Sequence, residues 1–189
     1  MGTVRGMLAV FAAVLMLRMA FSAAPSAKAD EYRCRGSVGA RTLDNVLVPS
    51  GSSCTLRGTT VKGNINVQGN ASLTLSGTRV VGSVQSQGHA RVTISSSTIN
   101  GSVQLDSGGP FTVQASEVGG SIQAVKNNGS SKIARNWVEA DIQVFNHAGA
   151  IAIGSNSVDG NLQCKENVPA PTGSGNVVQG NKEDQCRRL

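Results

Sequence analysis

The sequence contains 189 residues, including 23 glycines and four cysteines, and carries a formal net charge of +6. Arg5, Arg18 and Lys28 fall within residues 1–29; without them, 14 basic residues face 11 acidic ones, which leaves a net charge of +3. No segment interleaves clustered Lys and Arg with aromatic residues. Composition and charge therefore indicate an ordinary solvated surface and exclude a nucleic-acid-binding footprint.

Residues 1–29 have the parts of a secretory signal peptide. Arg5 gives a positive start, residues 7–17 (MLAVFAAVLML) form a short apolar run, and Ala27-Lys28-Ala29 is a cleavage site of the A-x-A type. The apolar run is too short to span a bilayer, and no later segment is apolar enough to insert. We therefore expect a mature chain that begins at Asp30, carries no integral membrane span and is secreted or lies in the cell envelope.

A repeat with a period of 19 or 20 runs through the rest of the chain. Its most regular part is V-x-G-[NS]-[IVL], in which a β-branched residue precedes a glycine by two positions and an aliphatic residue follows it by two. The glycine position is occupied in turn by Gly63, Gly82, Gly101, Gly120, Ala140, Gly160 and Gly180. Further apolar positions, among them Leu75, Ile94 and Val113, recur with the same period.

Apolar residues at alternate positions predict short β-strands. A single repeat cannot bury its apolar face, so the repeats are expected to stack and enclose a continuous interior. We predict that residues 30–189 form an all-β domain, a single-stranded parallel β-helix (β-solenoid) of about six to seven coils. The handedness of parallel crossover connections favours a right-handed coil. A helical solenoid is disfavoured because the repeats are rich in Val, Ile, Thr, Ser and Gly, and the glycines are expected at corners that need a positive φ or a close backbone approach.

The four cysteines lie near the two ends of this domain. The sequence separation is 20 between Cys34 and Cys54 and 22 between Cys164 and Cys186, in each case about one coil. An even number of cysteines in an oxidising compartment favours disulfides, and the chain lacks the close C-x-x-C pairs of a metal site. We predict the bridges Cys34–Cys54 and Cys164–Cys186, which would cross-link the exposed ends of the sheets. Each disulfide would stabilise the fold by about 3 kcal/mol, because it closes a loop in the unfolded chain.

The predicted outward positions also stack into columns. One column is Asn66, Gln85, Gln104, Gln123, Gln143 and Gln163. Another is Thr55, Thr74, Thr93 and Thr112, followed by Lys132 and Ala152. Strand propensity and amide stacking can account for both columns. The functional interpretation is a regular amide and hydroxyl face for a repetitive ligand, such as a glycan or ice, with Gln104, Gln123, Gln143, Thr74, Thr93 and Thr112 as candidate binding residues.

One coil, residues 132–147 (KIARNWVEADIQVFNH), departs from the pattern. Ala140 replaces the corner glycine, and Trp137, Phe145 and His147 are expected at or near the surface. Sugar-binding sites often pair an exposed aromatic platform with polar groups, which makes Trp137 a further candidate binding residue. The alternative is that Trp137 covers a corner of the coil, since isolated exposed aromatic residues are common.

Sequence motifs of catalysis are missing: the chain has no H-E-x-x-H and no G-x-S-x-G. No catalytic residue, metal or cofactor is therefore predicted. Glu139 and Asp159 occupy equivalent positions in successive repeats, which would place them about 5 Å apart. This separation is that of the two carboxylates of a retaining glycosidase, so a polysaccharide lyase or hydrolase is the alternative to a non-enzymatic function.

From about Asp44 to Gly180, the repeated V-x-G-[NS]-[IVL] motif resembles that of right-handed parallel β-helix proteins. The tripeptides GNI, GSV and GSI are similar to those of bactofilin-type polymer-forming proteins, and the chain as a whole resembles small exported bacterial β-helix proteins. Pectate-lyase-like enzymes share the architecture, but their functional residues have no counterpart in this chain. We expect an exported, non-enzymatic structural or binding module whose partner is an extended polymer, such as an envelope or extracellular glycan.

Overall fold

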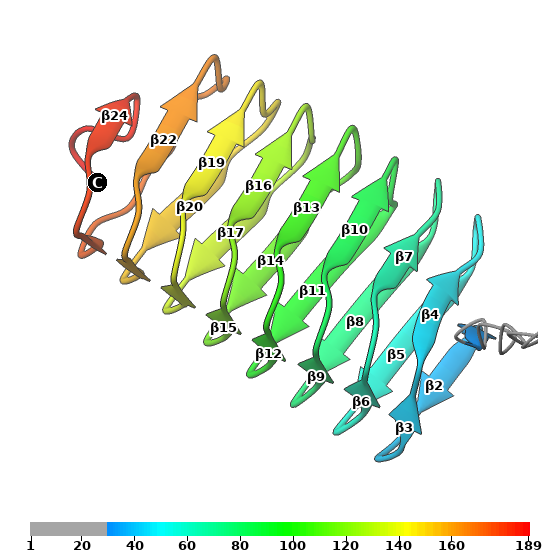
Figure 1. The fold of residues 1–189 in the computed structure, drawn as a ribbon. Helices are drawn as coiled ribbons and strands as arrows, with labels where there is room; N and C mark the ends of the chain where they lie inside the picture. Colours follow the sequence, from blue (N-terminus) through cyan, green and yellow to red (C-terminus); the bar gives the residue numbers. More distant parts are fainter. Residues whose placement is uncertain (1–29) are drawn as a thin grey trace, which may run out of the picture.

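Residues 30–189 of the computed structural model form an all-β solenoid (Figure 1). The predicted signal peptide, residues 1–29, lies outside the residues that the structure describes. Within the described part, 24 short strands form three parallel sheets, called sheets A, B and C. The chain passes through the three sheets in turn, so each coil supplies about one strand to each sheet. The predicted parallel β-solenoid is confirmed.

The strands of each sheet follow one another along the axis of the solenoid. Sheet A consists of β1 (Glu31–Arg33), β4 (Asn45–Val48), β7 (Ile65–Val67), β10 (Val84–Gln87), β13 (Val103–Asp106), β16 (Ile122–Val125), β19 (Ile142–Phe145), β22 (Leu162–Lys165) and β24 (Lys182–Asp184). Sheet B consists of β2 (Gly36–Val38), β5 (Ser53–Arg57), β8 (Ser72–Ser76), β11 (Arg91–Ser95), β14 (Phe111–Gln114), β17 (Ser131–Ala134) and β20 (Ile151–Gly154). Sheet C consists of β3 (Thr42–Leu43), β6 (Thr60–Val61), β9 (Arg79–Val80), β12 (Thr98–Ile99), β15 (Glu117–Val118), β18 (Trp137–Val138), β21 (Ser157–Val158) and β23 (Val177–Val178).

The stack has about eight turns, since sheet C contains eight strands. This is more than the roughly six to seven coils predicted from the repeat. The additional turn is built by residues 30–43, which lack the V-x-G-[NS]-[IVL] motif but whose strands β1, β2 and β3 pair in register with β4, β5 and β6. Backbone pairing with the next coil therefore defines the first turn without help from the motif. The right-handed winding stays a prediction.

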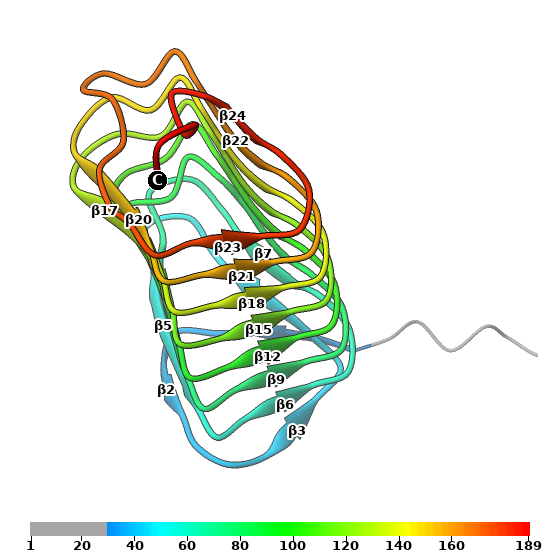
Figure 2. The ribbon, with the colours of Figure 1, turned by 90° about the vertical axis from the view of Figure 1, so that its left-hand side faces the viewer.

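Equivalent side chains of successive coils lie directly over one another. Leu75 pairs with Ile94 and Ile94 with Val113, and all three are fully buried. Figure 2 shows how this stacking turns the three sheets into the walls of a continuous interior, with sheet C as the nearest wall. Full burial of a side chain of this size contributes about 1.5–3 kcal/mol, so the interior columns are the main source of stability.

The repeated corner glycine is needed because the coils approach closely there. A Cβ on Gly101 would lie 2.8 Å from the carbonyl oxygen of Gly82 and closer still to Oγ of Ser83. The same Oγ accepts a hydrogen bond from the backbone N–H of Ser102, at 3.0 Å. This bond explains why Asn or Ser follows the glycine in most repeats. Most glycines of residues 30–189 lie, as expected, where φ is positive or the backbone of a neighbouring coil approaches closely. Other residues also adopt a positive φ at some corners, such as Arg135 (φ 57°).

A column of buried polar side chains runs inside the corner between sheets B and C. Its members are Thr59, Thr78, Ser97, Ser116, Asn136, Asn156 and Asn176, all buried. Each side-chain oxygen from Ser97 onward accepts a hydrogen bond from the backbone N–H of the equivalent residue in the preceding coil. The Asn amides also donate to carbonyl groups such as that of Ile133. Amide ladders in this protein are thus found inside the solenoid as well as outside it.

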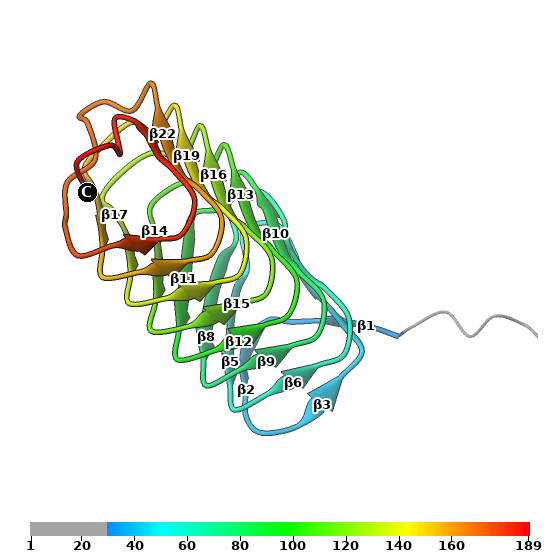
Figure 3. The same cartoon turned by 60° about the vertical axis from the view of Figure 1, so that its left-hand side comes forward.

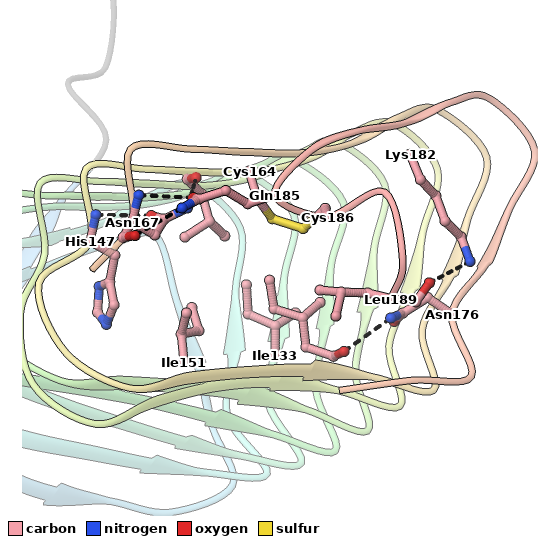
Figure 4. Close-up of a disulfide and its surroundings, with 12 residues drawn as sticks. Ile133, His147, Ile151, Cys164, Asn167, Asn176, Lys182, Gln185, Cys186 and Leu189 are labelled. Carbon is pink, nitrogen blue, oxygen red and sulfur yellow. Dashed lines mark hydrogen bonds between the residues drawn. A yellow bond between two sulfur atoms is a disulfide. The ribbon is translucent and has the colours of Figure 1, made fainter. Parts of the chain in front are cut away.

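Both ends of the solenoid are cross-linked as predicted. Cys34 is bonded to Cys54 and Cys164 to Cys186, with Cα–Cα distances of 5.5 and 5.2 Å. At the C-terminal end the chain turns back after β24, and the side chains of Cys186 and Leu189 cover the interior of the last coil (Figure 4). The two disulfides are consistent with an oxidising, extracytoplasmic compartment.

Candidate functional site

The three sets of predicted binding residues lie on three different faces. The Gln residues point outward from sheet A, the Thr residues from sheet B, and Trp137 from sheet C. Figure 3 shows the three sheets facing in different directions around the solenoid. The predicted binding residues therefore do not form one site, and each face has to be judged on its own chemistry.

On sheet A the five Gln residues of the predicted column form one hydrogen-bonded row, called here the glutamine ladder. Its members are Gln85, Gln104, Gln123, Gln143 and Gln163. Each Nε2 donates to Oε1 of the next member, at distances of 3.0, 3.2, 2.9 and 2.8 Å in chain order. The row ends on Glu183, whose Oε2 accepts from Nε2 of Gln163 at 2.9 Å. Asn66, the first residue of the column, makes no side-chain hydrogen bond to Gln85 within residues 30–189.

The glutamine ladder leaves half of its hydrogen-bonding capacity free for a ligand. A Gln amide has two N–H donors and two acceptor lone pairs, and a bond to each neighbour uses one of each. Every Gln that has a hydrogen-bonded neighbour on both sides therefore offers a ligand one N–H donor and one acceptor lone pair. These groups repeat at the coil spacing of about 4.8 Å. Because the bonds along the row already hold these side chains in one conformation, a ligand would lose little side-chain entropy on binding them.

A second outward column lies beside the glutamine ladder on the same face. It contains Gln87, Asp106, Val125, Phe145 and Lys165, which pair in register. Val125 and Phe145 are half-buried and give the face an apolar strip. A shallow hollow of about 490 Å³ opens between the two columns near Gln85, Gln104 and Asp106. The strict alternation of each strand places these residues two positions after the Gln residues, so the sequence contained the signal for this second column.

Phe145 and Trp137, which were expected at one surface of the same coil, lie on different sheets. Phe145 lies on sheet A, whereas Trp137 is 52% exposed on sheet C between Glu117 and Ser157. With Arg135, Trp137 borders a shallow hollow of about 540 Å³ near the corner with sheet B. Trp137 thus has the exposure that a stacking platform requires, although it is isolated from the amide column.

The threonine column on sheet B is in register as predicted. Thr55, Thr74, Thr93 and Thr112 pair in succession, and Lys132 and Ala152 continue the column. The four Thr side chains are partly exposed and form one row of hydroxyl groups. The row covers only the N-terminal half of the sheet, so it offers a shorter repetitive surface than the glutamine ladder does.

The two candidate catalytic carboxylates lie in the turns that directly follow two strands of sheet C. Glu139 and Asp159 directly follow Val138 and Val158, which are paired in register. Asp159 accepts a hydrogen bond from Nε2 of Gln179 at 2.8 Å, and Glu139 lines a hollow of about 320 Å³ together with Glu117. The two carboxylates are therefore neighbours, as predicted, but they belong to different local surroundings on an open surface.

Both histidines lie in an interior column, so the expected exposure of His147 is wrong. His147 is 1% exposed and its Nε2 lies 2.9 Å from the carbonyl oxygen of Gly129. Its ring packs edge-on against Phe111, with 5.7 Å between the ring centroids. The repeat explains why His147 is buried. The equivalent residues of the two adjacent coils, Asn127 and Asn167, also point into the interior and are buried.

His89 occupies the same column and forms a pair with Ser86. Nε2 of His89 lies 3.1 Å from the carbonyl oxygen of Gly109, which can only accept, so Nε2 carries the proton. Nδ1 therefore accepts a hydrogen bond from Oγ of Ser86, at 3.0 Å. Ser86 and His89 are only 7% and 2% exposed. This Ser–His pair is a satisfied interior contact, without the access to substrate that a nucleophile requires.

The buried histidines predict that stability falls in mild acid. Desolvation lowers the pKa of both His89 and His147 below the usual value of 6.5. This effect outweighs the opposing hydrogen bonds to the backbone, from Gly109 for His89 and from Gly129 and Ala150 for His147. The unfolded chain then binds more protons than the folded one below about pH 6.5. We expect the free energy of unfolding, measured with urea, to drop between pH 7.5 and pH 5.5 by up to about 1.4 kcal/mol per pH unit for each histidine.

A matched variant for this titration is His147→Asn, because Asn is the residue found at the equivalent position of both adjacent coils. This variant should lose the share of the pH dependence that His147 supplies. A stability that stays constant from pH 7.5 to 5.5, or an unchanged pH dependence in the variant, would contradict the assignment.

Within residues 30–189 no group of three or more His, Cys, Asp or Glu side chains is arranged to hold a metal ion. In the same residues no helix has the length and apolar character needed to cross a membrane.

Comparisons with models of known families, with curated proteins and with solved structures found no match for this chain.

Proposed function

We propose that this protein is a non-enzymatic binding module for an extended polymer, such as an envelope or extracellular glycan, and that the polymer lies along the glutamine ladder of sheet A. The observation that supports this is the unbroken head-to-tail row of five Gln side chains, which presents a free donor and a free acceptor at every coil. Sugar hydroxyl groups are themselves donors and acceptors, so they complement such a row.

The second column of sheet A adds an apolar component. Val125 and Phe145 lie beside Gln123 and Gln143 on adjacent strands, and the hydrocarbon faces of a sugar ring can pack on them while its hydroxyl groups reach the amides. A polymer that repeats its units would meet one Gln side chain in each of five successive coils, and the apolar strip in the two coils that carry Val125 and Phe145. Weak contacts of this kind add up along a chain, because each further unit binds intramolecularly.

Export to the cell envelope or the medium belongs to the same proposal. The signal-like start of the sequence and the two disulfides support it. A bacterial origin and a partial likeness to bactofilin-type repeats are proposed on the tripeptides alone.

The proposal predicts which face a glycan contacts. On a glycan array and in pull-downs with envelope polysaccharide, the wild-type protein should be retained, and Gln123→Ala should weaken retention about tenfold, since it removes two ligand hydrogen bonds and interrupts the row. Gln123 points away from the interior, so the variant should stay folded, and a thermal melt checks this. Thr93→Ala on sheet B and Trp137→Ala on sheet C are matched controls and should bind as the wild type does.

Two results would overturn this assignment. Loss of retention in Trp137→Ala with normal retention in Gln123→Ala would move the site to sheet C. Release of shortened sugar products by the wild-type protein, lost in Glu139→Gln, would establish the alternative function, a polysaccharide lyase or hydrolase.

A further inference from the structure

The glutamine ladder has a direction, and one residue outside it sets that direction. An isolated row of amides can run either way, because each Gln can exchange its oxygen and nitrogen by a half-turn of the amide group. Here the row ends on Glu183, and a carboxylate can only accept. Gln163 must therefore donate with Nε2 to Glu183, which leaves its Oε1 to accept from Gln143, and the same constraint passes down to Gln85.

The opposite end of the row consequently presents an acceptor. Oε1 of Gln85 has no hydrogen-bond donor within residues 30–189, and Gln85 lines the hollow of about 490 Å³ on sheet A. Aligned amides polarise one another, so the oxygen at the end of a row is a stronger acceptor than that of a lone amide. The hollow thus lies at the negative end of the row.

A carboxylate lies in the same hollow. Asp106 lines it together with Gln85 and Gln87, and one oxygen of Asp106 accepts from Oγ of Ser107 at 2.6 Å. Asp106 forms no ion pair in the described part of the chain, where Lys62 and Asp44 make the single pair. The basic residue of its column, Lys165, is separated from it by the strands that carry Val125 and Phe145. The hollow therefore combines a carboxylate with the acceptor end of the row, and none of its lining residues is cationic.

We propose that this hollow binds a protonated primary amine of the polymer, as found on an amino sugar without an acetyl group, and that Glu183 acts as a positioning residue by fixing the ladder in the direction that exposes Oε1 of Gln85. An ammonium group has three donors and no acceptor, which matches carbonyl and carboxylate oxygens. This inference rests on the proposed function, and it adds the chemical class of the ligand and a direction of binding.

The test uses oligomers of glucosamine and the same oligomers with every amine acetylated, titrated calorimetrically into the disulfide-bonded protein. The wild type should bind the free amine at least tenfold more tightly. Glu183→Lys replaces the terminal acceptor with a donor, reverses the row and turns an N–H of Gln85 toward the hollow, so the preference should disappear. Asp184→Lys is the matched control, because it makes the same change of charge one residue away and should keep the preference for the free amine. Asp184 has a φ of 50°, and Lys126 shows that a lysine can adopt such a value, since its φ is 54°.

The direction of the row is read without any ligand from scalar couplings across the hydrogen bonds. In the wild type, ¹⁵Nε2 of each Gln should couple to ¹³Cδ of the Gln in the following coil, and in Glu183→Lys to that of the preceding coil. Unchanged couplings in Glu183→Lys would overturn the role of Glu183. Correct couplings with equal affinity for both oligomers would overturn the amine site, while retention on neutral glycans in the array would still support the proposed function.

Discussion

Replacing Asn156 with alanine should lower the free energy of unfolding by about 4 kcal/mol. The Asn156 amide is buried and accepts from the backbone N–H of Asn136 at 3.0 Å, while it donates to the carbonyl of Ile133 at 3.0 Å. Alanine would leave both groups, and one N–H of the Asn136 amide, without a partner in the interior. Each unsatisfied buried group costs about 1–3 kcal/mol. Equilibrium unfolding in guanidinium, followed by circular dichroism, measures the loss.

The matched control for Asn156 is Asn128→Ala, which removes an exposed amide that makes no side-chain hydrogen bond within residues 30–189. This change should alter stability by less than about 0.5 kcal/mol. Equal stability losses in the two variants would mean that the interior amide column does not carry the backbone hydrogen bonds assigned to it.

The second large effect is expected for Gly149→Ala, which should cost more than about 3 kcal/mol or prevent folding. Gly149 has a φ of 128°, a conformation that side chains rarely adopt, and a Cβ there would lie 2.6 Å from the carbonyl oxygen of Gly129 and 2.9 Å from its carbonyl carbon. Two contributions add up in this variant. The first is backbone strain of about 1–3 kcal/mol. The second is the steric clash of the new Cβ with Gly129, which forces the two coils apart. Expression yield and guanidinium unfolding of the purified variant provide the measurement.

Gly88→Ala separates the two contributions. Gly88 has a φ of 72°, but the atom nearest to a Cβ placed on it, Cα of Gly69, is 3.6 Å away. Ser107 and Lys126 occupy the equivalent positions at φ values of 52° and 54°, so this corner accepts side chains. We expect a loss of about 1 kcal/mol. A Gly149→Ala protein as stable as Gly88→Ala would show that the coils can move apart at little cost.

The sequence predicted the architecture well because the solenoid repeats one simple pattern. Alternation within each strand and the regular period of the repeat were enough to place Leu75, Ile94 and Val113 in one interior column and to pair the cysteines. The first turn was harder to predict because residues 30–43 lack the motif, and only backbone pairing shows that they complete a coil.

The site was predicted less fully because a corner residue's direction depends on the path of the coil. Ser and Asn are mostly exposed in proteins, and His is intermediate. Asn156 nevertheless points inward and donates to the Ile133 carbonyl, and His147 packs against Phe111. Trp137 is separated from the Gln column because it lies on sheet C. The alternation of apolar and polar residues shows which side chains point outward, but not on which of the three sheets they lie. Glu183, however, follows Gln163 by one full period of the repeat, so the sequence could have identified it as the end of the row.

The measurement that tests the binding face most directly is a titration of the ¹⁵N-labelled protein with the glycan that the array retains. The largest shifts should fall on the side-chain amides of Gln85, Gln104, Gln123, Gln143 and Gln163, and the indole N–H of Trp137 should not move. Shifts centred on Trp137 or on the Thr column of sheet B, or no retained glycan to titrate, would contradict binding along the glutamine ladder.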